Sequence, residues 1–280
     1  FLDSLLLFEE DEKPRSLPKG DKDGWLLTLR GQVLDDEAIA WLDTAIVLIP
    51  DDKKQRNESP MLGSGGNIGN SDFSNRFMQM LAMVLPLAKT TKIADESRVL
   101  LDAALFETPT DGLAAKPIDQ FDPGNAGGKN MGTGFDGKSL LNPWDYVFMI
   151  EGALIISGGA AKRLGTGATT SVFPFSVNSS VGGGAADLSD DTRGEIWLPT
   201  WNAFATCLEM QSLFSEGRSD FGNTPARTGV DFALAVSTLG VDRGLSEFVR
   251  FQFQKRLGDN YLANRIGTHA VKSNPRASLV

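Results

Sequence analysis

The segment DPGNAGGKNMGTGFDGKS (residues 122–139) and the residues LLNPWD (140–145) that follow it decide how this chain is organised. Glycine loses more conformational entropy on folding than any other residue, so a long segment rich in it usually brings backbone amides close to another molecule. Asn142 suits a helix N-cap and Pro143 suits the first helical position. The sequence therefore predicts an amide-rich loop that leads into a helix running toward Leu164.

A second segment of the same kind lies upstream. GSGGNIGN (residues 63–70) precedes an apolar stripe that starts at Phe73 and is stopped by Pro86. Backbone amides at the start of a helix attract anions, including phosphate groups. Two such loops, each opening a helix, favour a protein that binds phosphates or a polymer backbone.

The composition indicates a globular chain with few groups for covalent or metal chemistry. Its 280 residues are 41% hydrophobic, which is enough to bury a core, and the length gives a prior of roughly two domains. A single cysteine, Cys207, excludes an internal disulfide, and a single histidine, His269, excludes an ordinary zinc site. No stretch approaches the ~20 apolar residues that cross a bilayer. We expect a cytoplasmic protein with no cofactor, no metal site and no membrane partner.

The charge is unevenly distributed along the sequence. The net charge of -9 argues against unspecific nucleic-acid binding over the whole surface. Residues 226–280, however, hold eight Lys or Arg against four Asp or Glu, a local charge of +4. This excess favours a polyanion contact in the C-terminal part, and a solvated charged face is the alternative.

Hydrophobic periodicity predicts an α+β fold. Residues 1–115 are expected to be mostly helical, with the glycine loop at 62–72, and residues 116–280 to be mixed, with short antiparallel strands and the glycine loop at 122–139. Because the chain begins on Phe1 and not on methionine, we expect a fragment of a longer subunit. Expected helices cover about residues 35–49, 73–85, 95–106, 204–214, 232–239 and 245–249, and expected strands 25–29, 169–177, 194–201 and 261–266.

Residues 132–139, GTGFDGKS, match the Walker A pattern, which makes a P-loop ATPase one alternative. A P-loop follows a buried strand and passes straight into a helix. Here no apolar run precedes the motif, Pro143 places the helix start about four residues late, and Asp136 would repel phosphate. Cys207 is expected in the core and His269 on the surface, and neither has a catalytic partner in the sequence. We therefore expect no enzymatic activity and no catalytic residue.

Three groups of segments resemble one protein family. The first is LGSGGN (62–67) with DFSNRFMQ (72–79); the second is GG (127–128), GFDG (134–137), NPWD (142–145) and EGAL (151–154); the third is RGEIWLP (193–199), ARTGVDF (226–232) and LGVDRG (239–244). In order and spacing, over about residues 62–266, they resemble the large subunit of the type I-G (formerly I-U) CRISPR Cascade effector.

The resemblance implies a non-catalytic component of an RNA-guided antiviral ribonucleoprotein complex. Such a subunit contacts the guide RNA, reads the short flanking motif (PAM) beside the target in duplex DNA, and helps recruit the helicase-nuclease. Its other partners would be the backbone and guide-processing subunits of Cascade. Guide pairing supplies the long sequence readout in such systems, whereas protein contacts test the flanking motif.

The candidate contacts lie in the two glycine-rich loops and the basic C-terminal part. Asparagine amides can bond base edges, glycine amides can bond phosphates, and basic side chains can pair with phosphates. The candidate nucleic-acid-binding residues are Gly66, Asn67, Asn70, Asn75, Arg76, Asn125, Lys129, Asn130, Lys138, Arg250, Lys255 and Arg256.

Two other interpretations stay open at this stage. Asn and Gly are also ordinary residues of tight turns, and Asn75 could bond within its own helix. A purely structural subunit that contacts only neighbouring proteins is the second alternative to a nucleic-acid-binding subunit, and the acidic net charge is compatible with it.

Overall fold

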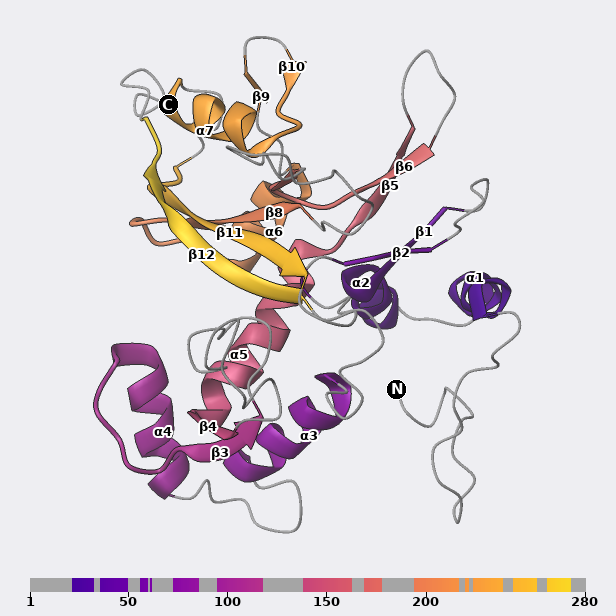
Figure 1. Ribbon diagram of the computed structural model, residues 1–280. Coiled ribbons are helices and arrows are strands. Elements are labelled where there is room, and N and C mark those ends of the chain that lie inside the picture. Colours follow the sequence, from indigo (N-terminus) through magenta and orange to yellow (C-terminus); the bar gives the residue numbers. More distant parts are fainter. Residues whose placement is uncertain are drawn as a thin grey trace. The chain divides into compact units, whose positions relative to one another are not determined.

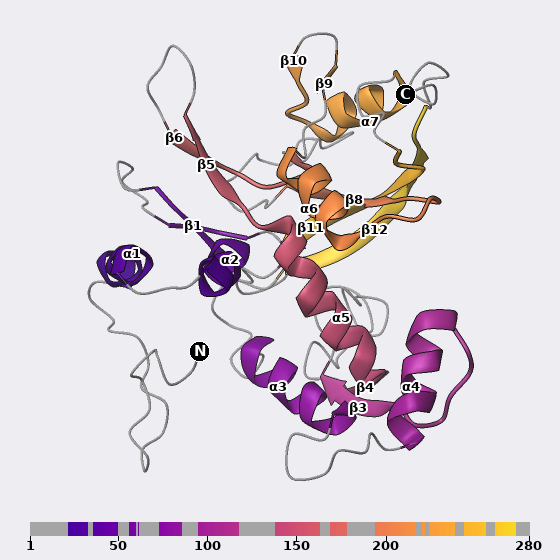
Figure 2. The ribbon, with the colours of Figure 1, turned by 180° about the vertical axis from the view of Figure 1, so that it is seen from behind.

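The chain folds into two compact units that combine helices with antiparallel strands (Figures 1 and 2). A computed structural model describes residues 22–32, 36–49, 56–59, 61, 73–85, 95–117, 138–162, 169–177, 194–216, 220–221, 224–238, 244–255 and 261–272. The predicted α+β class is confirmed. The first unit comprises residues 1–59 and 157–173 and the second 60–156 and 174–280, so the boundary expected near residue 115 falls inside the second unit. Within the described residues, no helix combines the length and apolarity needed to cross a membrane.

The described part of the first unit contains two helices and two antiparallel strand pairs. Its elements are α1 (Lys22–Gln32), α2 (Asp36–Ala45), β1 (Ile46–Leu48), β2 (Arg56–Glu58), β5 (Gly159–Lys162) and β6 (Thr169–Val172). β1 pairs with β2, and β5 pairs with β6. Acidic Asp36 and Glu37 in the first turn of α2 suit the helix dipole, whereas β-branched Ile46 and Val47 favour the strand that follows.

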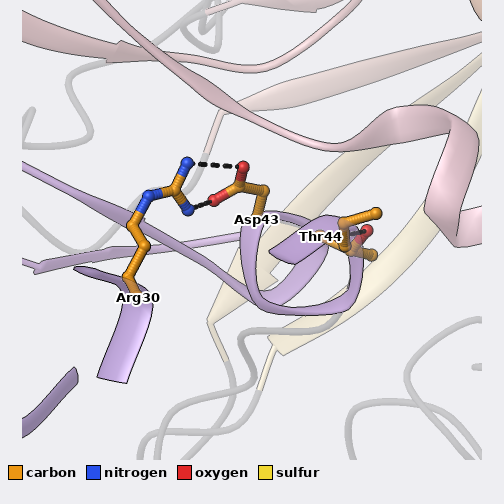
Figure 3. Close-up of polar contacts among 4 residues, drawn as sticks. Arg30, Asp43 and Thr44 are labelled. Carbon is orange, nitrogen blue, oxygen red and sulfur yellow. Dashed lines mark hydrogen bonds and ion pairs between the residues drawn. The ribbon is translucent and has the colours of Figure 1, made fainter. Parts of the chain in front are cut away.

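A charged pair joins the two helices of the first unit. Figure 3 shows the Arg30 guanidinium of α1 facing the Asp43 carboxylate of α2, with two hydrogen bonds, one of them 2.9 Å between Nη2 and Oδ2. Both side chains are partly exposed, so this pair fixes the geometry of α1 more than it adds stability.

Gly158 explains why the helix expected to reach Leu164 stops earlier. A Cβ at Gly158 would lie 2.4 Å from the Phe173 ring and 2.5 Å from Val47, and the Gly158 amide donates to the Asp43 carbonyl at 3.0 Å. α5 (Pro143–Ala153) therefore gives way to a 3-10 turn, η2 (Leu154–Ile156), and then to extended chain in β5.

The second unit has a helical part whose elements flank the two glycine-rich segments along the sequence. Its elements are α3 (Phe73–Val84), α4 (Asp95–Phe106), β3 (Ala114–Pro117), β4 (Lys138–Leu141) and α5. α3 and α4 each pack against α5, and β3 pairs with β4 in an antiparallel hairpin. These helices are close to those predicted from the apolar stripes and the Asn142–Pro143 start signal.

The rest of the second unit is built on a four-stranded antiparallel sheet. Its strands are β7 (Ser176–Val177), β8 (Glu195–Thr200), β11 (Glu247–Lys255) and β12 (Tyr261–Ala270), in the order β12-β11-β8-β7. Figure 1 shows β11 and β12 as the two longest strands, curved and side by side. The remaining elements are α6 (Cys207–Glu216), β9 (Asp220–Phe221), β10 (Thr224–Pro225) and α7 (Gly229–Ser237).

An aromatic cluster holds α7 against this sheet. The Trp197 ring of β8 stacks on the Phe232 ring of α7, with 4.5 Å between centroids, and Phe248 of β11 meets Phe232 edge-on at 5.2 Å. Phe175 meets the Phe248 ring at 5.2 Å. These four side chains are at most 4% exposed, so the cluster forms the centre of the second unit's core.

Three segments differ in type from the sequence prediction. Residues 46–48, expected to continue the helix of residues 35–49, form strand β1. Residues 25–29 belong to helix α1 and not to a strand. Residues 247–255 form strand β11 and not a helix, because this segment is hydrogen-bonded to β8 on one side and β12 on the other. A pairing with two distant strands overrides a short apolar spacing that fits either structure.

Candidate nucleic-acid interface

The candidate residues divide into three groups by what the structure describes. Arg76 and Arg250 are described with their side chains. Asn75, Lys138 and Lys255 are described by their backbone, in α3, β4 and β11 respectively. Gly66, Asn67, Asn70, Asn125, Lys129, Asn130 and Arg256 lie outside the described residues, so their role stays a prediction.

The second glycine-rich segment is the connection of a β-hairpin. Pro117 of β3 is paired with Lys138 of β4, and Ala114 with Leu141, so the two ends of the intervening chain are held side by side. β4 leads through Asn142 into α5. The amide-rich segment is therefore anchored at both ends by paired backbone.

Asn142 fixes the point where this hairpin becomes a helix. Its Oδ1 accepts a hydrogen bond from the Trp144 amide at 3.0 Å, which is the N-cap interaction predicted from the sequence. Its Nδ2 donates to the Leu100 carbonyl of α4 at 2.8 Å, and the side chain is buried. One residue thus caps α5 and attaches its start to α4.

Further polar contacts join α3, α4 and α5 into one platform. Ser97 Oγ donates to the Val84 carbonyl at the end of α3 at 2.6 Å, and Trp144 Nε1 donates to the Ser97 carbonyl at 3.0 Å. α3, which follows the first glycine-rich segment, therefore shares a rigid support with α5, which follows the second. The structure brings the attachment points of both segments into the same unit.

Arg76 of α3 is buried within the platform and contacts α5. The residue is 6% exposed, and its guanidinium carbon lies 5.9 Å from the centroid of the Tyr146 ring on α5. A cation over an aromatic face is stabilising when desolvated. This contact accounts for Arg76 as a link between α3 and α5, whereas pairing with phosphate stays a prediction.

The Walker-like segment does not have the geometry of a P-loop. Its last two residues, Lys138 and Ser139, lie in strand β4 and pair with Pro117 and Lys116 of β3. In a P-loop these two residues open a helix, whose N-terminus receives the phosphates. Here the helix begins at Pro143.

Arg250 lies in a buried charged cluster of the sheet. It bonds Glu195 of β8, which is 1% exposed, and its guanidinium carbon lies 5.1 Å from the Trp197 ring centroid. His269 of β12 lies half-buried on the same Trp197, with 4.8 Å between ring centroids. Burial and the neighbouring Arg250 charge lower the His269 pKa. No local pattern in the sequence points to this cluster, because Arg250 and Glu195 are far apart along the chain.

One expectation about a potential catalytic residue was wrong. Cys207 begins α6 on the exposed side, because α6 buries Met210 and Phe214 and not its first residue. His269, expected on the surface, is partly exposed and lies against the Trp197 ring. Among the residues that the structure describes, no group of three or more His, Cys, Asp or Glu side chains is arranged to hold a metal ion.

The sequence was compared with protein-family models and with curated proteins, and neither comparison gave a match.

Proposed function

We propose that this chain is the non-catalytic large subunit of an RNA-guided surveillance complex of the type I-G CRISPR Cascade class. In that role it contacts the guide RNA and the flanking motif of the target duplex, and it helps recruit the helicase-nuclease. Its other partners are the backbone and guide-processing subunits, and its place is the cytoplasm. The support is the resemblance of the three sequence groups over about residues 62–266.

The single structural observation that supports this proposal is the common platform of α3, α4 and α5. Both glycine-rich segments are attached to it: the first precedes Phe73, and the second joins Pro117 to Lys138. Amide-rich sequence joined to such a support suits phosphate and base-edge contacts, because fixed attachment points limit the entropy lost on binding. Lys129 would supply a phosphate contact and Asn67 a base-edge or sugar contact.

The proposal is tested by target-duplex binding of Asn67→Ala and Lys129→Ala variants in the assembled complex. We expect both to bind the duplex more weakly while partner subunits still assemble. Lys129→Ala should also lower the slope of log affinity against log salt by about 1, since one phosphate contact is lost. Matched controls are Asn202→Ala and Arg98→Ala, exposed residues outside both segments, which should leave affinity and slope unchanged.

The same titration separates the two alternatives. A subunit that contacts only proteins would show neither a salt-dependent affinity of its own nor an effect of either variant. A P-loop ATPase would bind ATP tightly in the presence of magnesium and lose that binding in Lys138→Ala. Unchanged duplex binding in both Asn67→Ala and Lys129→Ala would remove these residues from the interface.

A further inference from the structure

Helix α4 has two unlike faces. One face packs inward: Ser97 and Leu100 are buried, and both take part in the hydrogen bonds to α3 and α5 described above. The other face carries large apolar side chains in the open: Val99 is 54% exposed, Leu105 56% and Phe106 71%. Since the inward face packs on α5, these exposed side chains lie on the part of α4 that does not contact α5.

Two of the exposed apolar side chains form a stripe along the helix. Val99 and Phe106 are seven residues apart, close to two helical turns, whereas Leu105 projects about 100° around the helix from Phe106. Glu107, directly after the helix, has a φ of 54°, in the left-handed region that usually ends a helix at glycine. The chain therefore changes direction at Glu107, and the Phe106 side chain at the C-terminal end of α4 is exposed to solvent.

Acidic residues surround this stripe. Over residues 95–112 the chain has five acids and one base, a net charge of -4, and all six side chains are exposed. Asp102 falls between Val99 and Phe106 on the same side of the helix. The acids are Asp95, Glu96, Asp102, Glu107 and Asp111, and the base is Arg98.

We propose that the outward face of α4 is a docking surface for a basic amphipathic helix of a partner protein. Apolar residues of the partner at i, i+3 or i+4, and i+7 would cover Val99 and Phe106, and its flanking Lys or Arg would pair with Asp102 and Glu107. This surface goes beyond the proposed nucleic-acid contacts and does not depend on them.

The charge pattern disfavours two other occupants, a polynucleotide and a second copy of this chain. A polynucleotide would place its phosphates against a face with a net charge of -4. A second copy docked symmetrically through the same face would oppose one acidic stripe with another, because a two-fold interface puts the same patch on both sides. A basic helix satisfies both the charge and the apolar stripe.

The test uses the full chain and a fluorescein-labelled synthetic peptide of about 15 residues, the length at which an isolated helix starts to be populated. The peptide carries Leu at positions i, i+3, i+4 and i+7 with Lys on both flanks. Fluorescence anisotropy should show saturable binding to the wild-type chain. The double variant Val99→Ser/Phe106→Ser should bind about tenfold or more weakly, because the centre of the contact is lost.

Control variants distinguish specific binding at this face from nonspecific hydrophobic binding. Phe204→Ser removes another exposed aromatic side chain, located between β8 and α6, and should leave peptide affinity unchanged. Asp102→Lys should weaken the Lys peptide, and a peptide with Glu in place of Lys should regain affinity for that variant. Circular dichroism melting should be the same for all variants, since the replaced side chains are exposed.

Several outcomes would overturn the proposal. These are no binding to the wild-type chain, equal binding to wild type and Val99→Ser/Phe106→Ser, or equal affinity of the Lys and Glu peptides for the wild type. Self-association of the chain that disappears in Val99→Ser/Phe106→Ser would assign the face to a second copy instead.

Discussion

The guanidinium of Arg250 holds the carboxylate of Glu195 through two hydrogen bonds, 2.8 Å from Nε to Oε2 and 2.7 Å from Nη2 to Oε1. Gly229, the first residue of α7, packs directly against this pair. The side chain of Glu195 is fully buried and that of Arg250 is 17% exposed. The contact therefore joins β8, β11 and α7, and most of the charge on Arg250 is balanced inside the fold.

Arg250→Met should destabilise the protein strongly. It keeps an apolar stem but leaves Glu195 as an unpaired buried charge, which costs about 3–5 kcal/mol. Urea unfolding measures the loss. The double variant Glu195→Gln/Arg250→Met should recover part of it, because no buried charge remains. A loss below about 1 kcal/mol in Arg250→Met would show that water reaches the Glu195 carboxylate.

Gly229→Ala and Gly152→Ala should change stability in opposite directions. A Cβ at Gly229 would lie 2.1 Å from Glu195 Oε2 and 2.6 Å from Arg250 Nη2, so the pair must shift at a cost of about 1–3 kcal/mol. A Cβ at Gly152, inside α5, would meet nothing within 4 Å. There the helix should gain about 0.5–1 kcal/mol. Thermal unfolding of both variants measures the two effects, and equal midpoints would contradict the packing of Gly229 on the charged pair.

Asn142 should show two separable contributions to stability. Asn142→Ser keeps an N-cap oxygen but loses the donor to the Leu100 carbonyl, a cost of about 1 kcal/mol. Asn142→Ala loses the cap as well, and the total should reach about 2 kcal/mol. Chemical unfolding of the two variants gives the comparison. Equal losses would mean that the N-cap contributes nothing beyond the link between α4 and α5.

Acid should destabilise the protein through His269. Burial lowers the pKa of His269 in the folded state below its ordinary value near 6.5, with Arg250 as a second cause. The unfolded chain therefore takes up the proton first, so stability is complete above about pH 6.5 and falls as the pH falls toward the folded pKa. Unfolding midpoints at about pH 7.5 and 5.5 should differ more in the wild type than in His269→Gln. An identical pH dependence in both would contradict this assignment.

Local signals in the sequence predicted the parts of the fold that depend on neighbouring residues. The apolar stripe of α3, the helix expected from Asp95 to Phe106 and the Asn142–Pro143 start of α5 depend on short stretches of chain, and the structure has all three. The spacing of Leu245, Phe248 and Val249 fits a helix or a strand. Pairing of β11 with β8 and β12 decides for the strand, and that pairing joins residues distant in the sequence.

The contacts of the candidate site residues could not be predicted from the sequence. A basic residue is equally compatible with phosphate and with an internal partner, and nothing adjacent to Arg76 or Arg250 indicates Tyr146 or Glu195. The amphipathic pattern of α6 similarly did not separate Cys207 from the face that Met210 and Phe214 bury. Asn67 and Lys129 lie outside the described residues, and their contacts remain predictions.

Co-expression of this chain with a guide RNA and partner subunits, followed by purification, tests directly whether the chain belongs to an RNA-guided complex. We expect the wild-type chain to retain RNA of discrete length together with the partner subunits. We expect Asn67→Ala/Lys129→Ala to retain the subunits but to bind less of an added target duplex. Partner subunits recovered with no RNA, or a target-duplex affinity that neither salt nor the double variant changes, would contradict the proposed function.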